Sequence, residues 1–246
     1  MDSRFLGVNN ATNVIRSMLL FRRRPRRRRE PVAEMRELEI ARMGRRGDGI
    51  ADLTDRSVYV PYALPGETVR AEVRGERGRL LKVVAPAANR VQAPCLHFGY
   101  CGGCAIQHIA DADYRAWKLD MVRSVLSRRG LAADVPDLID AHGAGRRRVS
   151  VHARGQGGRV FVGFMRVRGH QLRAVDHCLL LTPGLHSVFD MSASMAAALD
   201  LENGEVNLHW TETENGLDCD LRHAGDLSYD RQVALADAAH EYDLAR

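Results

Sequence analysis

Hydrophobic and polar residues alternate over much of the chain, in short runs that have the two-residue period of half-buried β-strands. Before residue 90, such runs fall at 37–41, 49–52, 57–61, 68–73 and 80–84. Glycines and a turn at 64–67 separate them, and the second and third runs are spaced as a hairpin. Five short strands in about fifty residues are typical of an oligonucleotide-binding type of β-barrel, although other small barrels share the pattern.

The rest of the chain mixes strands with helices. Strand patterns recur at 149–154, 160–164, 172–175, 205–210 and 217–221, and helical periods at 111–129, 182–199 and 228–244. Gly130 should end the first helix, and Thr182 followed by Pro183 should begin the second. Apolar stripes predict which helical side chains are buried, and these are Tyr114, Trp117, Met121, Val122, Val125, Leu126, Leu185, Val188, Phe189, Met195, Leu199, Val233, Leu235, Ala236 and Ala239.

These elements predict a fold that is mainly β with an α+β part. We divide the chain into an arginine-rich extension that we expect to be disordered (1–35), a small barrel like the oligonucleotide-binding fold (36–90) and an α+β domain (91–246).

Candidate chemistry is concentrated in one loop, where Cys95, Cys101 and Cys104 follow the spacing C-x5-C-x2-C. A fourth cysteine, Cys178, follows after 73 further residues. Gly102 and Gly103 allow the backbone to turn tightly and to present N–H groups to sulfur ligands. Four such thiols suit zinc or a [4Fe–4S] cluster, and a single Cys-x2-Cys pair with one remote ligand favours iron–sulfur over zinc.

Other roles for these residues fit less well. Disulfides are not expected, because no secretory signal is visible and cytoplasmic thiols stay reduced. His97 and His108 are possible ligands, but with four cysteines present they are better explained as groups around the centre or at the surface. Cys219 lies in an alternating run, which predicts a half-buried strand residue rather than a nucleophile.

Charge is distributed unevenly along the 246 residues, whose net charge is +5. Residues 1–34 carry nine arginines and three acidic residues, which leaves −1 for the remainder. Any nucleic-acid footprint on the folded part must therefore be a local patch. The tail could be a basic arm, a targeting peptide, or sequence upstream of the true start at Met35, which we favour. No apolar run approaches the ~20 residues that span a bilayer, so we expect a cytoplasmic protein.

With these pieces in place, the chain resembles the bacterial 5-methyluridine methyltransferases that act on 23S ribosomal RNA. The resemblance covers residues 36–246, and its most specific part is the cysteine loop. The motifs that carry it are Pro94-Cys95, His97-Phe98-Gly99, Cys101-Gly102-Gly103-Cys104, Gln107-His108, Arg146-Arg147-Arg148, Val162-Gly163-Phe164 and Cys178.

The resemblance implies a TRAM domain followed by a central domain whose four cysteines ligate a structural [4Fe–4S] cluster. It also implies that structured ribosomal RNA is the partner, with Arg146, Arg147 and Arg148 contacting it. The sequence does not fix the oligomeric state, and we expect a monomer. S-adenosylmethionine would be the methyl donor, but the chain has no Gly-x-Gly turn for it after Cys178. We therefore expect that the catalytic domain is absent and that this chain alone is inactive. The alternatives are a standalone iron–sulfur or zinc RNA-binding module and an electron-transfer protein.

Overall fold

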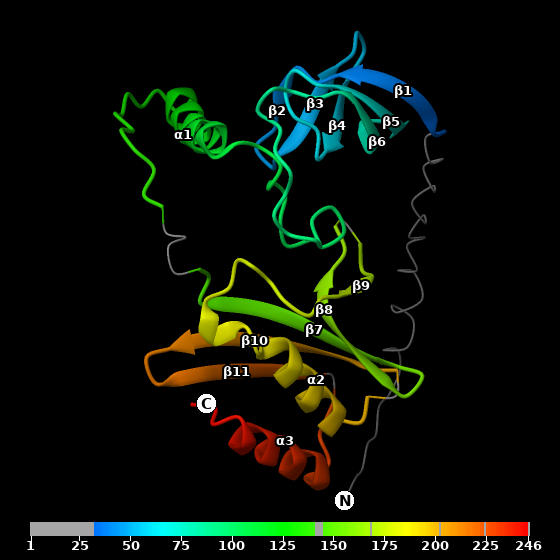
Figure 1. Ribbon diagram of the computed structural model, residues 1–246, viewed down its shortest axis with the longest axis vertical. Coiled ribbons are helices and arrows are strands. Elements are labelled where there is room, and N and C mark those ends of the chain that lie inside the picture. Colours follow the sequence, from blue (N-terminus) through cyan, green and yellow to red (C-terminus); the bar gives the residue numbers. More distant parts are fainter. Residues whose placement is uncertain (1–31, 141–144, 168, 202, 224, 246) are drawn as a thin grey trace, which may run out of the picture. The chain divides into compact units, whose positions relative to one another are not determined.

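The computed structural model describes residues 32–140, 145–167, 169–201, 203–223 and 225–245. The part of the chain that it describes is mainly β, with two sheets and three α-helices (Figure 1). Residues 33–246 belong to one compact unit. The arginine-rich block of the predicted extension lies outside the described residues.

The first sheet contains six strands in the order β1-β5-β6-β4-β3-β2. Their bounds are Glu34–Glu39 (β1), Arg42–Met43 (β2), Asp48–Asp52 (β3), Ser57–Pro61 (β4), Thr68–Arg74 (β5) and Arg77–Ala85 (β6). All five predicted strands are confirmed, as is the hairpin of β3 and β4; the two-residue strand β2 was too short to predict.

Alternation explains the core of this sheet, because Val69, Ala71 and Val73 of β5 are fully buried and the residues between them are not. They pack with buried residues of β1, β3 and β4 in one hydrophobic cluster. Among the described residues no strand pairing joins the edge strands β1 and β2. The structure therefore shows an open six-stranded sheet where the sequence predicted a barrel.

The second sheet is antiparallel, with its strands in the order β11-β10-β7-β8-β9. Their bounds are Arg148–Gln156 (β7), Arg159–Met165 (β8), Leu172–Ala174 (β9), Glu205–Thr213 (β10) and Gly216–His223 (β11). Val206, Leu208 and Trp210 alternate inward along β10. All five strands lie where the sequence predicted them.

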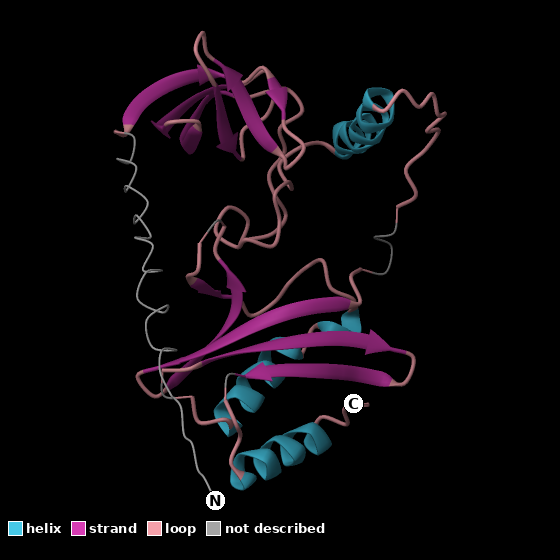
Figure 2. Ribbon diagram, turned by 180° about the vertical axis from the view of Figure 1, so that it is seen from behind, coloured by secondary structure: helices cyan, strands magenta, loops and turns pink. Residues whose placement is uncertain are grey.

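Two helices lie on one side of this sheet, as Figures 1 and 2 show from opposite directions. Helix α2 (Val188–Ala198) packs on the sheet after a short 3-10 helix, η1 (Pro183–Leu185), and α3 (Tyr229–Glu241) packs on α2. The predicted inward residues Leu185, Val188, Phe189, Met195 and Leu199 are all buried.

Two helix predictions need correction. Helix α1 (Asp111–Arg128) ends within one residue of the predicted range and is followed by Gly130, which adopts φ 69°. It contains no buried residue, however, so its stripe, including Trp117, does not enter a core. On α3 the buried residue is Ala238, whereas Val233 is 40% exposed.

None of the helices in the described residues is long and apolar enough to cross a membrane.

Candidate metal centre

The loop that carries the first three cysteines is built from consecutive tight turns. Phe98 N–H donates to the Cys95 carbonyl at 3.1 Å, and the N–H groups of Tyr100 and Cys101 donate to the His97 carbonyl at 3.1 and 2.9 Å. These hydrogen bonds fold the five residues between Cys95 and Cys101 back on themselves. The loop therefore has a defined shape before any metal is considered.

Backbone pairing attaches this loop to the end of β8. Gly102 N–H donates to the Met165 carbonyl at 2.9 Å, and Cys101 forms an isolated β-bridge with Arg166. Gly103 N–H instead faces the Cys101 sulfur, with 3.3 Å between N and Sγ. The sequence predicted that glycine N–H groups could donate to the sulfurs of a cluster; the Gly103 N–H faces a cysteine sulfur, and its donation to a cluster stays a prediction.

The fourth cysteine is positioned by the segment that follows β9. Leu181 N–H donates to the Cys178 carbonyl at 3.2 Å. Arg146, just before β7, donates its N–H to Leu180 at 2.7 Å and accepts from Thr182 N–H at 3.1 Å. The arginine run is therefore held against the segment that carries Cys178.

All four predicted ligands border one cavity of about 220 Å³. Cys95, Cys101, Cys104 and Cys178 are each half-buried and free of disulfides. The chain thus brings together thiols separated by up to 83 positions. The other polar residues around the cavity are His97, Gln107, Arg146, Arg148, Ser150 and His177.

The thiols affect one another electrostatically. Burial raises the pKa of Cys101, and the charges of Cys178 and Cys95 raise it further, against the Gly103 N–H that lowers it. Burial also raises the pKa of Cys104, although the Gln107 side chain lowers it by donating a hydrogen bond. Because only thiolates ligate metals, these thiols must lose protons when a metal binds.

The sulfur atoms are not tightly clustered. The described residues include all four cysteines. Among these residues, the one group of three His, Cys, Asp or Glu donor atoms within 4.8 Å of one another is that of His97, Asp176 and His177. Tetrahedral zinc with Zn–S bonds of ~2.3 Å needs sulfurs only about 3.8 Å apart. The thiols are therefore spread more widely than a zinc ion requires.

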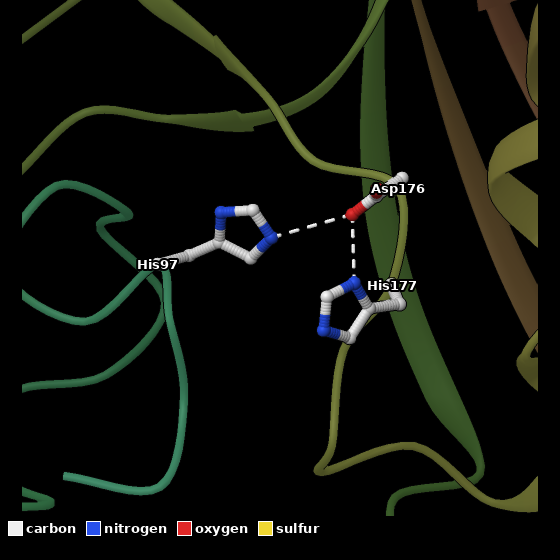
Figure 3. A group of neighbouring side chains, drawn as sticks. All are labelled: His97, Asp176 and His177. Carbon is white, nitrogen blue, oxygen red and sulfur yellow. Dashed lines mark hydrogen bonds and ion pairs between the residues drawn. The ribbon is translucent and has the colours of Figure 1, made fainter.

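His97 and His108 are not alike. His97 contacts Asp176 and His177 beside the cavity (Figure 3), in a group that the sequence analysis did not identify. The Asp176-His177-Cys178 run was the only signal for it in the sequence. The pKa of the Asp176 carboxyl lies below its usual range because His177 donates a hydrogen bond to it.

His108 is only 2% exposed and packs against the Phe98 ring at 5.3 Å. Neither of its ring nitrogens has a hydrogen-bond partner. Burial and the charge of Arg90 lower its pKa to about 4, despite the opposing charge of Glu67. His108 is therefore a neutral, buried residue that packs against Phe98 of the loop and does not line the cysteine cavity.

The remaining candidate residues are the arginine run and Cys219, which lie at different strands of the second sheet. Arg146, Arg147 and Arg148 are exposed, and the first and last of them border the cysteine cavity. Cys219 lies on β11 opposite Trp210, and burial raises its pKa to about 12. A half-buried strand residue was predicted, and the structure confirms it.

Sequence comparison shows that the chain is similar to RNA methyltransferases, although no family model matches it. It is 40% identical over 222 residues to an uncharacterized RNA methyltransferase of Caulobacter vibrioides, covering 86% of this chain and 53% of the relative. A 23S rRNA (uracil(1939)-C(5))-methyltransferase RlmD of Halomonas elongata is 32% identical over 220 residues, covering 83% of this chain and 45% of the relative. The chain spans about half the length of the curated relatives it matches.

Proposed function

We propose that this chain is the RNA-recognition portion of an S-adenosylmethionine-dependent 23S rRNA 5-methyluridine methyltransferase, stabilised by a structural [4Fe–4S] cluster. The observation that carries the proposal is the convergence of Cys95, Cys101, Cys104 and Cys178 on one cavity. The similarity to RNA methyltransferases, including RlmD proteins named for 23S rRNA, supports the methyltransferase part of the proposal.

The donor set suits a cluster better than a single zinc ion. Four half-buried thiols surround the cavity, and the Gly103 N–H already faces one sulfur. Tetrahedral zinc would need its sulfur ligands about 3.8 Å apart. No three of these sulfurs lie within 4.8 Å of one another. In a four-iron cluster each thiolate binds a different iron, so wider separation is expected.

The role of the bound cluster is to join segments that are distant in sequence. It would supply iron–thiolate bonds between the 95–104 loop and the segment at Cys178. The protein itself contributes the turns at His97, the pairing of Gly102 with Met165 and the hydrogen bonds of Arg146, which orient the thiols. Methyl transfer from S-adenosylmethionine has no redox step for a cluster to perform, so a structural role follows.

RNA would contact exposed arginines and half-buried aromatic rings. Arg146, Arg147 and Arg148 are exposed and follow one another at the entry to β7, where their guanidinium groups can reach phosphates. On α1, Lys118 lies 5.5 Å from the Tyr114 ring and 5.4 Å from the Trp117 ring. Because this stripe is not buried, its rings are available for base stacking. We assign residues 36–90 to a TRAM-type RNA-binding unit.

Metal analysis tests the cluster. Protein purified without oxygen should be brown and contain about four iron and four sulfide per chain. Serine in place of any of the four cavity cysteines should lower the iron content, whereas Cys219→Ser should not, because that thiol is remote from the cavity. Stoichiometric zinc without iron would contradict the assignment.

Salt-dependent binding tests RNA recognition. Anisotropy with a structured 23S rRNA fragment should show that changing Arg146, Arg147 and Arg148 to Gln weakens binding and reduces the slope of log K against log salt by about 0.7–0.9 per lost phosphate contact. The matched control changes Arg222 and Arg231, which are also partly exposed, to Gln. Equal losses in both variants would mean that general charge, and not this run, controls binding.

A further inference from the structure

A second group of potential metal ligands lies beside the cysteine cavity. Figure 3 shows His97, Asp176 and His177 directed toward one another, with His97 on a different segment from the other two. His97 Nε2 lies 3.4 Å from Asp176 Oδ1, and His177 Nδ1 lies 2.7 Å from the same oxygen. The two imidazole centroids are 5.2 Å apart.

Hydrogen bonding does not fully account for this arrangement. His177 forms an ordinary hydrogen bond with its neighbour Asp176. His97 Nε2, in contrast, is shielded from solvent and has no hydrogen-bond partner of good geometry. A buried polar atom without a partner is unfavourable, and a bound ion would give this nitrogen one.

The separations match the donor spacing around a small transition-metal ion. Zinc bonds to nitrogen and oxygen are ~2.0–2.2 Å long, which puts neighbouring donors about 2.8–3.6 Å apart in octahedral to tetrahedral geometry. The observed 3.4 Å lies within this range, and the observed 2.7 Å lies just below it. Two imidazoles and one carboxylate are a donor set that favours borderline divalent ions over Mg²⁺ or Ca²⁺.

We propose that His97, Asp176 and His177 bind one divalent transition-metal ion of the zinc type, separately from the four-cysteine centre. Asp176 is 84% exposed and His177 is 48% exposed, so water can complete the coordination shell. The ion joins the cysteine loop, through His97, to the residues that immediately precede Cys178. It therefore forms a second cross-link, exposed to solvent, between the two segments that carry the thiols.

This inference does not depend on RNA binding or on methyl transfer. Its test uses the full chain without a histidine tag and with the cysteine centre filled as purified. Co²⁺ is the probe, because its optical spectrum separates nitrogen and oxygen ligation, which gives weak d–d bands only, from thiolate ligation, which adds strong charge-transfer bands. Iron content is measured in parallel and reports on the cysteine centre separately.

We expect one equivalent of Co²⁺ to bind without thiolate bands and without loss of iron, and Zn²⁺ to displace it. Asp176→Asn is the decisive variant, because that side chain is exposed and its change leaves the packing intact. It should weaken binding by at least about 10–100-fold, as should His97→Gln and His177→Gln. The matched controls are His186→Gln and Asp190→Asn, both at exposed positions outside the group, and they should bind as the unchanged protein does.

Three outcomes would overturn the site: no saturable binding, thiolate bands on all bound Co²⁺, or unchanged affinity in Asp176→Asn with its fold and iron content intact. If the iron is missing while the thiolate-free site still binds Co²⁺, the proposed cluster fails and this site stands.

Discussion

At the scale of single residues, Gly102 is where the cysteine loop approaches the backbone of β8 most closely. A Cβ atom at this position would lie 2.5 Å from the Met165 carbonyl oxygen. We expect Gly102→Ala to push the loop away from β8, to lower iron loading and to cost about 1–3 kcal/mol of stability. Iron per chain and thermal unfolding measure both effects.

The matched control for this change is its neighbour. At Gly103 a Cβ would meet only the Cys101 sulfur, at an ordinary 3.4 Å. Gly103→Ala should therefore retain most of its iron. Equal losses in the two variants would show that flexibility of the pair matters more than the approach to Met165.

The buried imidazole of His108 should make the stability of the fold depend on pH. Its pKa is about 4 in the folded chain and 6.5 as the ordinary value, so the unfolded chain binds the proton more readily between those two pH values. The stability that neutral His108 contributes is complete above about pH 6.5 and is lost as the pH falls toward 4, by roughly 3 kcal/mol in total.

Urea unfolding of the unchanged protein and of His108→Gln isolates this effect. The stability difference between the two proteins should shift in favour of the variant as the pH falls from about 6.5 to 4. His186→Gln is the control, because that residue is exposed and should not alter the profile. A difference that stays constant with pH would contradict the assignment of His108 as a buried neutral group.

Single residues also show what the sequence can predict about the site. The four cysteines were predicted because thiols are rare and their spacing is distinctive. Asp176 and His177 were not predicted, because their approach to His97 depends on how β9 and the cysteine loop meet in space. Residue spacing carries no information on such a long-range contact.

At the scale of elements, β10 and α2 are joined by a buried hydrogen bond in which Trp210 Nε1 donates to Ser192 Oγ at 2.9 Å. Ser192→Ala leaves the indole N–H buried without a partner and should cost about 1–3 kcal/mol. Denaturant unfolding measures the loss. Ser194→Ala on the same helix is the control, since Ser194 is only partly buried; a similar loss there would assign the effect to the helix and not to the hydrogen bond.

The sequence predicted the positions of elements with a strong hydrophobic period, but it was less informative about which of their residues are buried. The sequence located the strands of both sheets and α1, because alternation and helical spacing are local signals. It did not reveal that the apolar stripe of α1 has no buried residue, with Val122 48% and Val125 44% exposed. Burial depends on which other elements reach that face, and the local pattern does not record this.

At the scale of the whole molecule, the cysteine centre joins the region after the first sheet to the second sheet. Cys101 is paired with Arg166 at the end of β8, and Cys178 packs against the core of the second sheet. Occupation of the centre should therefore stabilise more than its own loop. Because a ligand that binds only the folded state stabilises it by mass action, removing the metal should also destabilise the fold around β7, β8 and β9.

Filling this centre should itself depend on pH. Burial and neighbouring thiols raise the pKa values of Cys101 and Cys104, so both are protonated in the metal-free chain near neutral pH. Each must lose its proton to ligate a metal, so reconstitution should release protons and become weaker as the pH falls.

Iron uptake by the stripped protein, followed from about pH 9 to 6, should decline steadily. Cys219→Ser should follow the same curve, because that thiol, with its pKa of about 12, stands outside the cavity. Loading that is independent of pH would mean that the thiols are already ionised and that burial does not control their charge.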